Sequence, residues 1–370
     1  MEANKGNKFE LETPCIILDL ETVEKNLKKM KSLAESKGKN LRPHIKTHKC
    51  ITLAKKQIEY GAIGVCAAKV SEAEKLAEAG INGILLTGPF TGKINSVLQI
   101  ISVSPALMVT LDHPSEAENL NTALHSKGLK IDVLLDIDAG LRRTGVQPSG
   151  ALKLADFILS KKNLRLRGIQ AYAGHLQHIL SFKERKDASY RSLGEIIPIF
   201  NKLKSEVDGF SIFSASGTGT FEIDSSIPEV TEHQVGSYVC MDSEYLAVDS
   251  SEDGKGFKTF DPALRLLTTV VSVNQKGYVT VDAGLKSLYK DGAVPQVITP
   301  GFSEMKYDWF GDEYGKIIYQ AGQKAPVLGT VLELIVSHCD PTINLFDHFF
   351  ITRGDKVVDI WPIELRGCSR

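Results

Sequence analysis

Lys46 lies between two histidines in the segment RPHIKTHK, residues 42–49. A lysine ammonium that is desolvated and surrounded by other cations has a lowered pKa, and its free amine can condense with an aldehyde. The pattern of the surrounding residues predicts that Lys46 ends a short strand. Taken alone, the segment is more typical of a basic turn at the surface, because clustered charges usually face water. A chemical role therefore depends on which other residues accompany Lys46.

A candidate anion site follows in SASGTGT, residues 214–220, directly after an apolar run. Backbone amides in such a turn can approach a phosphate closely, and a helix that begins there adds its dipole. The alternative, a flexible polar turn, is equally compatible with an isolated GTG. A second small-residue turn lies at 236–238. The residues expected to bind the anion are Ser216, Gly217, Thr218, Gly219 and Thr220, together with Gly236, Ser237 and Tyr238.

His338 and Asp340 stand two residues apart at the end of the apolar run 326–338. On an extended backbone, alternate side chains face the same way, so both could bind one cation while Cys339 faces the opposite way. Imidazole and carboxylate suit a divalent ion that keeps positions open for water and a substrate oxygen. The alternative is an ordinary surface turn.

The elements that must position these residues alternate regularly up to about residue 225. Amphipathic stretches such as 20–38, 71–80 and 114–128 separate eight strand-like runs, and no GxGxxG follows the first. This favours an α/β fold of the (β/α)8 TIM barrel type over an open nucleotide-binding sheet. The runs cover residues 15–20, 41–46, 62–68, 83–88, 107–112, 131–138, 166–172 and 210–216.

After about residue 230 the chain changes to short β-rich runs at 263–275, 277–284, 326–338 and 347–363, which predict a C-terminal antiparallel β domain. We expect the barrel to span 13–240, and the β domain to span 241–370 together with residues 1–12. Working residues of such barrels follow the carboxyl ends of strands. Besides Lys46, this position holds Asp138 with AGLRRTG, Tyr172 with AGHLQH, and Ser214.

The composition favours a small-molecule partner. The 370 residues carry a net charge of -1, which provides no field for nucleic acid or an anionic membrane. The chain has no apolar run of the roughly 20 residues that a membrane helix needs, and no apolar signal core near its start, so a cytoplasmic location is expected. The six cysteines lack CxxC spacing, which argues against a disulfide framework or a structural zinc site.

A reactive lysine and a separate phosphate site in one barrel suggest pyridoxal 5'-phosphate, whose aldehyde needs an amine and whose phosphate needs an anchor. The chain also resembles a known family across almost its whole length, from about Thr13 onward. Its ordered motifs RPHIKTHK, GLRRTG, YAGHLQH, SGTGTF, QVGSYVCMD, DAGLKS and HCDPTINLFD resemble those of the D-threonine aldolase and eukaryotic-type D-serine dehydratase family. Those are fold-type III pyridoxal phosphate enzymes with an alanine-racemase-like barrel.

The resemblance implies a role for each matched residue. Lys46 would condense with the cofactor aldehyde, Arg143 would lie near the cofactor or the substrate carboxylate with Arg142 as the second choice, and Tyr172 would line the cofactor face. The residues at 216–220 and 236–238 would hold the phosphate. His338 and Asp340 would bind the metal. The second ligand is aspartate in the aldolase-like members and often cysteine in the dehydratase-like ones, so Asp340 favours Mn²⁺ or Mg²⁺, with Zn²⁺ possible.

These roles predict an aldolase that cleaves D-3-hydroxyamino acids to glycine and an aldehyde, with His48 as the general base and His175 and His178 as competitors. An alternative is a dehydratase that converts D-serine or 3-hydroxyaspartate to a 2-oxo acid and ammonia. A third is a noncatalytic pyridoxal phosphate carrier, which would not need the metal pair. The resemblance also implies a head-to-tail homodimer in which the β domain of one subunit covers the barrel mouth of the other.

Overall fold

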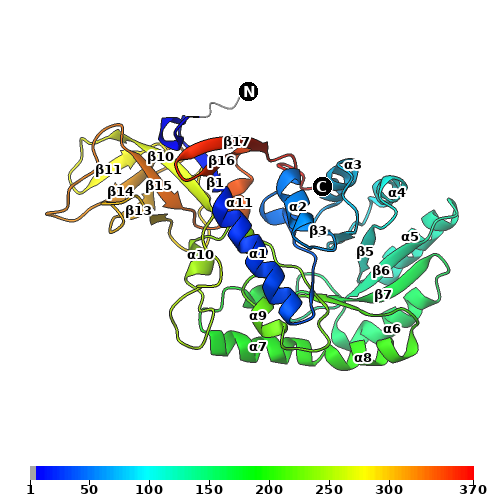
Figure 1. Ribbon diagram of the computed structural model, residues 1–370. Helices are drawn as coiled ribbons and strands as arrows, with labels where there is room; N and C mark the ends of the chain where they lie inside the picture. The colour runs from blue at the N-terminus through cyan, green and yellow to red at the C-terminus, as the bar shows by residue number, and fades with distance from the viewer. Residues whose placement is uncertain (1–5) are drawn as a thin grey trace. The chain divides into compact units, whose positions relative to one another are not determined.

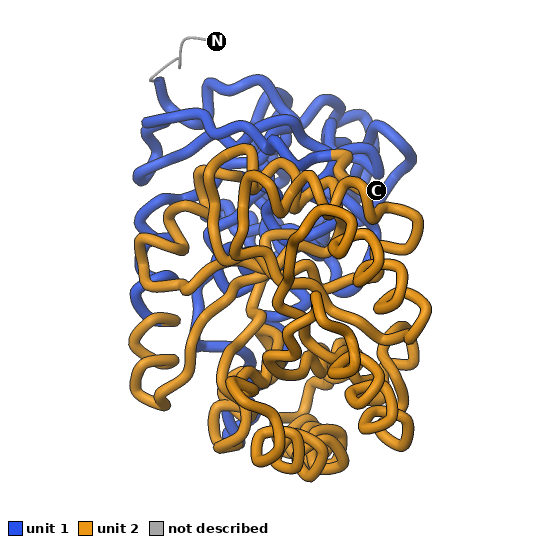
Figure 2. The backbone as a smooth tube through the Cα atoms, turned by 90° about the vertical axis from the view of Figure 1, so that its right-hand side faces the viewer, with its two compact units in different colours: residues 1–29, 47–50, 237–366 blue, residues 30–46, 51–236, 367–370 orange. Residues whose placement is uncertain are grey.

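A computed structural model describes residues 6–370 (Figure 1). The chain forms two compact units, coloured separately in Figure 2. The barrel unit comprises residues 30–46, 51–236 and 367–370. The β unit comprises the chain up to residue 29, residues 47–50, and residues 237–366. Of the segment 1–12 that the sequence assigns to the β domain, residues 1–5 lie outside the described residues.

The barrel unit contains an eight-stranded sheet in the order β2-β9-β8-β7-β6-β5-β4-β3, with all neighbouring strands parallel. A parallel bridge between His44 and Cys66 joins the segment after β2 to β3, so the sheet closes on itself. The predicted (β/α)8 barrel is confirmed. Its strands are β2 (Asn40–Leu41), β3 (Val65–Ala67), β4 (Ile84–Leu86), β5 (Met108–Leu111), β6 (Ile131–Asp136), β7 (Leu164–Ala171), β8 (Ile212–Ala215) and β9 (Glu232–His233).

The strand-like run at 15–20 was predicted to begin the barrel, and this was wrong. Cys15–Asp19 forms β1 of the β unit, where it pairs with β10 (Leu264–Ser272) and β16 (His348–Arg353). The barrel strand that was missed is β9. With only two residues, β9 is too short to show a periodicity, whereas an apolar run such as CIILD can be buried in either kind of sheet.

Helices surround the barrel sheet (Figure 1). Helix α1, which begins in the β unit and ends in the barrel unit, shows why such amphipathic helices form: its apolar residues at 20, 23, 27, 30 and 34 recur every three or four positions, and all are buried. None of the helices within residues 6–370 is long and apolar enough to cross a membrane. The helices before residue 237 are α1 (Leu20–Ser36), α2 (Ile51–Glu59), α3 (Val70–Glu78), α4 (Ile94–Val103), α5 (Pro114–His125), α6 (Pro148–Leu159), α7 (Phe182–Gly194), α8 (Ile197–Glu206) and α9 (Phe221–Asp224).

The β unit contains a nine-stranded sheet in which only the β1–β16 pair is parallel, as the predicted antiparallel domain requires. Because β11 pairs with both β10 and β14, six of its strands form a closed ring. Its elements are β1, β10, β11 (Tyr278–Val281), β12 (Gln296–Val297), β13 (Lys306–Trp309), β14 (Gly315–Ile318), β15 (Val331–Ile335), β16, β17 (Lys356–Pro362), α10 (Ser243–Leu246) and α11 (Cys339–Ile343).

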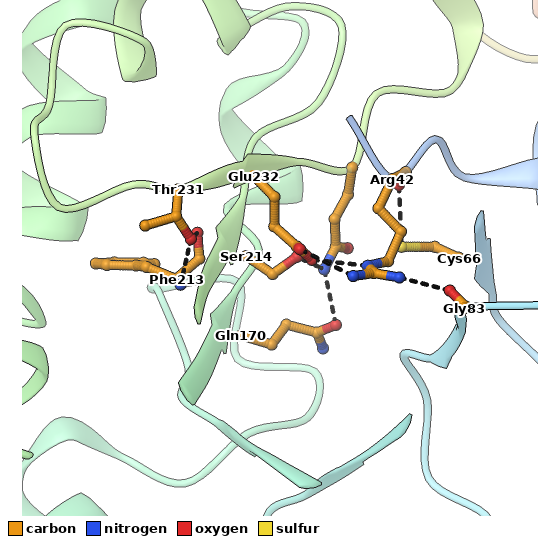
Figure 3. A network of polar contacts seen from close by, with 9 residues as sticks. Arg42, Cys66, Gly83, Gln170, Phe213, Ser214, Thr231 and Glu232 are labelled. Atoms are coloured by element: carbon orange, nitrogen blue, oxygen red, sulfur yellow. Dashed lines mark hydrogen bonds and ion pairs between the residues drawn. The ribbon is translucent and has the colours of Figure 1, made fainter. Parts of the chain in front are cut away.

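A buried ion pair ties β2 to β9 inside the barrel unit, four residues before Lys46 (Figure 3). Arg42 donates from Nε and Nη2 to the two carboxylate oxygens of Glu232, at 3.0 and 3.1 Å. Its Nη1 donates to the carbonyl oxygen of Gly83 at 2.5 Å. A Cβ atom at Gly64 would lie 2.6 Å from that nitrogen, so a side chain at position 64 would displace the guanidinium. Breaking a buried pair of this kind is strongly destabilising.

Candidate active site

Lys46 lies in a short 3-10 helix, η2 (Ile45–Thr47), and not at the end of a strand as predicted. Strand β2 ends at Leu41, and the bridge at His44 is the last sheet contact before η2. The Lys46 side chain is half-buried, and its backbone N–H donates to His44 Nδ1 at 3.4 Å. Since His44 Nε2 lies 3.2 Å from Thr87 Oγ1, the imidazole before Lys46 is held against the barrel.

The two residues after Lys46 are buried. His48 Nδ1 accepts the backbone N–H of Cys50 at 3.2 Å, so the proton of the neutral ring resides on Nε2. This ring can accept another proton only at Nδ1, after it releases the Cys50 N–H. The Oγ1 of Thr47 is buried and has no hydrogen-bond partner within residues 6–370. An orphan hydroxyl beside Lys46 fits a site that a bound ligand completes.

Four other parts of the predicted site also follow barrel strands. Arg143 comes after β6, Tyr172 after β7, residues 216–220 after β8, and Gly236 after β9. Because the carboxyl ends of parallel strands meet at one end of a barrel, these residues lie at the same end as Lys46. His48, Ser237 and Tyr238 belong to the β unit, as do His338 and Asp340.

The neighbouring residues Arg142 and Arg143 lie in different surroundings. Arg142 has a φ of 58°, a conformation that non-glycine residues rarely adopt, and lines a cavity of about 260 Å³ between the loop after β6 and helix α7. The charge of Arg143 acts instead on Asp136, the last residue of β6. Burial raises the pKa of Asp136 to about 7, although the hydrogen bond from Gln170 and the Arg143 charge oppose the rise. Arg143 thus acts on a buried carboxylate at the carboxyl end of β6, whereas Arg142 lines the cavity beside α7.

Asp138 orders the loop that carries both arginines. Its Oδ1 accepts the backbone N–H groups of Gly140 and Arg142, both at 2.9 Å, and its Oδ2 accepts Gln147 Nε2 at 2.8 Å. Burial alone would raise the pKa of Asp138, but these donors outweigh it and lower the pKa. Both oxygens of the Asp138 carboxylate therefore accept hydrogen bonds that hold this loop.

The loop 216–220 packs tightly on Gln177. The backbone N–H of Gly219 donates to Gln177 Oε1 at 3.0 Å, and Gln177 Nε2 donates to Thr220 Oγ1 at 3.1 Å. A Cβ atom at Gly219 would lie 2.1 Å from the Gln177 carbonyl oxygen, and one at Gly217 would lie 2.4 Å from Gln177 Oε1. Close approach of the two segments therefore requires glycine at 219, where the clash is with backbone, whereas a Cβ atom at 217 would displace the end of the Gln177 side chain. The hydrogen bonds to Gln177 therefore fix the conformation of this loop.

Other interactions fix the two ends of this loop. Ser216 has a φ of 70°, and its Oγ lies 2.9 Å from Nδ1 of the buried His233, whose pKa is lowered to about 3 by burial and by the charge of Lys39. Helix α9, which follows the loop, has only four residues. The helix dipole that the sequence led us to expect at the anion site is thus the dipole of a single turn.

His338 and Asp340 are close, but not because of strand alternation. Strand β15 ends at Ile335, His338 is the residue before helix α11, and Asp340 lies in the first turn of that helix. The extended geometry assumed from the sequence was therefore wrong for Asp340. Burial alone would lower the pKa of His338, but Asp340 and the neighbouring carboxylates overcome this effect and raise it. Cys339 is fully buried.

Carboxylates surround His338. Its Nδ1 lies 3.1 Å from Asp291 Oδ2 and 3.9 Å from Glu244 Oε2, and Asp242 also acts on its charge. Within residues 6–370, no three His, Cys, Asp or Glu side chains form a ready metal cluster. A two-residue donor set of nitrogen and oxygen leaves positions open for water and substrate, as catalytic metal sites require. An imidazole nitrogen at His338 and a carboxylate oxygen at Asp340 are donors of the kinds that such an ion binds.

Three residues that contact predicted site residues, one in the barrel unit and two in the β unit, were missed by sequence reasoning. Gln177 is part of the motif YAGHLQH but had no assigned role, while Glu244 and Asp291 had no recognised signal. Asp291 lies in a Lys-Asp-Gly turn, which predicts a loop but gives no indication that the loop reaches His338.

Comparisons with known proteins match both parts of the chain. Residues 18–244 match the alanine racemase N-terminal domain, and residues 263–352 match a putative serine dehydratase domain. A 3-hydroxy-D-aspartate aldolase from Paracoccus denitrificans is 33% identical over 98% of this chain and 94% of its own length. A D-threonine aldolase from Arthrobacter sp. is 34% identical over 97% and 94%. The crystal structure of D-threonine aldolase from Filomicrobium marinum is 33% identical, with a TM-score of 0.93 over the whole of both chains.

Proposed function

The chain belongs to the D-threonine aldolase and D-serine dehydratase family of fold-type III pyridoxal phosphate enzymes, and we propose that it cleaves D-3-hydroxyamino acids to glycine and an aldehyde. The observation that carries this proposal is that His338 and Asp340, a nitrogen donor and an oxygen donor, stand two residues apart at the start of α11 in carboxylate-rich surroundings. Relatives that share about a third of this sequence bear aldolase names.

Pyridoxal phosphate is the proposed organic cofactor. Lys46 would bind its aldehyde, Tyr172 would line its face, and the turns 216–220 and 236–238 would hold its phosphate. The orphan hydroxyl of Thr47 supports this assignment, and Gln177 fixes the conformation of the turn 216–220. When bound, the cofactor supplies an electron sink for the electron pair left at Cα when a bond to that atom breaks.

His338 and Asp340 would hold the divalent ion. Such an ion supplies a positive charge that makes a substrate hydroxyl more acidic. Carboxylate and imidazole donors favour Mn²⁺ or Mg²⁺, and the same pair can also accept Zn²⁺.

The chain's own side chains then bind the substrate and move its protons. Arg143 would hold the α-carboxylate through charge-assisted hydrogen bonds and so fix the orientation of Cα. Lys46 Nζ, once released by the incoming amine, would stand ready to exchange a proton. His48 is our candidate for taking the proton of the β-hydroxyl, with His175 and His178 as competitors. Taking that proton at Nδ1 requires His48 to release the Cys50 N–H.

A dehydratase is the second candidate, because residues 263–352 match a putative serine dehydratase domain. In that reaction the Cα–H bond breaks and the β-hydroxyl leaves, so the products are a 2-oxo acid and ammonia. In aldol cleavage the Cα–Cβ bond breaks instead. Which bond breaks depends on how the substrate is oriented about Cα.

One assay separates these functions. The purified, pyridoxal phosphate-loaded protein is incubated with Mn²⁺ and either D-threonine, D-serine or D-3-hydroxyaspartate. Glycine and an aldehyde are expected, and their formation should stop when a chelator removes the metal. A 2-oxo acid and ammonia as the main products would show a dehydratase. A yellow protein that converts none of these D-amino acids, with or without metal, would point to a noncatalytic carrier.

A further inference from the structure

We propose that Asp291 is a positioning residue for the metal site: its carboxylate accepts the Nδ1 proton of His338 and so places the lone pair of the ring on Nε2, the atom that would bind the divalent ion. The inference rests on the proposed function, because the ion is the one assigned there to His338 and Asp340. It adds a residue that does not itself bind the ion.

The contact between the two side chains supports this role. Asp291 Oδ2 lies 3.1 Å from His338 Nδ1, within hydrogen-bond distance. A neutral imidazole has one N–H and one lone pair, so a carboxylate that holds the N–H at Nδ1 places the lone pair on Nε2. Metal-binding histidines usually have such an acceptor on their second nitrogen, which fixes both the tautomer and the ring orientation.

The loop that carries Asp291 is anchored on both sides of it. Before Asp291, the Oγ of Ser337 donates to the carbonyl oxygen of Tyr289 at 2.5 Å, which joins the loop to the residue preceding His338. After Asp291, Gly292 has a φ of 69°, and a Cβ atom there would lie 2.6 Å from the Glu244 carboxyl group. The loop therefore packs directly on Glu244, and glycine at position 292 permits this packing. Asp291 is held where it meets His338 even though its side chain is 57% exposed.

The two other nearby carboxylates fit this role less well. Asp242 already accepts the backbone N–H groups of Tyr245 and Cys339, each at 2.9 Å, and thereby caps the starts of α10 and α11. Glu244 lies 3.9 Å from Nδ1, beyond hydrogen-bond distance. Of these carboxylates, Asp291 is thus the one whose hydrogen bond can orient His338.

The test compares Mn²⁺ affinity in variants of the pyridoxal phosphate-loaded protein, with free Mn²⁺ measured by electron paramagnetic resonance. Asp291→Ala should weaken Mn²⁺ binding about 10- to 100-fold, because orientation and charge are both lost. Asp291→Asn should lose less Mn²⁺ affinity than Asp291→Ala, because the amide oxygen of asparagine can still accept the Nδ1 proton of His338. The control Asp208→Asn removes one exposed carboxylate from the barrel unit and should leave the affinity unchanged. The melting temperature of each metal-free variant shows whether it is folded.

The outcomes separate this inference from the proposed function. The inference is wrong, although the metal site stands, under three joint results. Wild type binds Mn²⁺, His338→Ala abolishes this binding, and folded Asp291→Ala binds Mn²⁺ as tightly as wild type does. If Asp291→Ala and Asp291→Asn both lose as much affinity as His338→Ala, Asp291 is a direct ligand and the positioning role is also wrong. If wild type binds no Mn²⁺, or His338→Ala binds it unchanged, the metal part of the proposed function fails.

Discussion

Lys46 is the side chain on which the covalent part of the proposed chemistry depends. Lys46→Arg keeps the positive charge but cannot condense with an aldehyde, because a guanidinium stays protonated at all accessible pH values. We expect the variant to lose the visible absorbance of the lysine-bound cofactor, and its turnover of D-threonine to fall by about 10³-fold or more. Absorbance spectroscopy and single-turnover assays measure both effects.

The matched control is Lys49→Arg, three residues along the same segment. Lys49 has a φ of 50°, and its carbonyl oxygen accepts the backbone N–H of Leu365. A lysine-to-arginine change leaves both features intact, so the absorbance band should persist. If Lys46→Arg retains the band and Lys49→Arg loses it, Lys46 is not the cofactor lysine.

Short motifs made some site residues predictable. Lys46 stands out because four other basic residues cluster around it within eight positions, and His338 because an imidazole and a carboxylate end an apolar run. Gln177 and Asp291 act through contacts with residues more than 40 positions away, the loop 216–220 and His338. A single sequence carries no local signal for such contacts, so these two residues required the structure.

At the scale of elements, the regular alternation of strands and helices predicted the barrel, but the short elements were missed. β9 has two residues, and its place between β2 and β8 is stabilised by the buried pair of Arg42 and Glu232. Asp340 was placed on an extended segment, although helix α11 begins one residue earlier. In both cases tertiary contacts, including the capping of α11 by Asp242, decide the conformation more than local propensity does.

Gly219 tests whether the loop on Gln177 is the phosphate site. In Gly219→Ala the added Cβ atom would lie 2.1 Å from a backbone oxygen, so the loop must shift. Overpacking of this kind costs about 1–3 kcal/mol. We expect pyridoxal phosphate to bind about 10-fold more weakly or worse, as measured by fluorescence titration of the metal-free protein.

Gly194→Ala is the corresponding control. Gly194 is the last residue of α7, and a Cβ atom there meets nothing within 4 Å. The substitution should leave cofactor affinity unchanged and leave stability equal or slightly higher. Unchanged pyridoxal phosphate affinity in a folded Gly219→Ala variant would remove this loop from the cofactor site.

At the scale of the whole molecule, Asp136 predicts how stability varies with pH. Burial raises its pKa from 3.8 to about 7 in the folded protein, so between these values folding takes up a proton. The contribution of Asp136 is most favourable below its unfolded pKa and is lost as the pH rises through about 7. Asp136→Asn removes this dependence. Its unfolding free energy relative to wild type should therefore rise between pH 4 and pH 7, by up to about 4 kcal/mol.

Urea unfolding of wild type and Asp136→Asn at several pH values measures the effect. The control Asp208→Asn removes an exposed carboxylate, and its free energy of unfolding should follow that of wild type across the range. A constant difference between Asp136→Asn and wild type from pH 4 to pH 8 would show that Asp136 ionises normally in the folded protein.

Assembly is the last property that the molecule as a whole should show. We expect a homodimer of the 40.5 kDa chain, as the family resemblance implies. The β unit displays large exposed apolar side chains, among them the adjacent Val327 and Leu328 with 66% and 62% exposure, and we expect the dimer contact to include this pair. Leu328→Glu should therefore weaken the dimer about 10-fold or more in sedimentation velocity.

The control is Val103→Glu, which changes an equally exposed residue at the end of α4 in the barrel unit and should leave the dimer affinity unchanged. A wild-type protein that sediments as a monomer at micromolar concentration would contradict the prediction, and an effect of Val103→Glu alone would move the interface to the barrel unit.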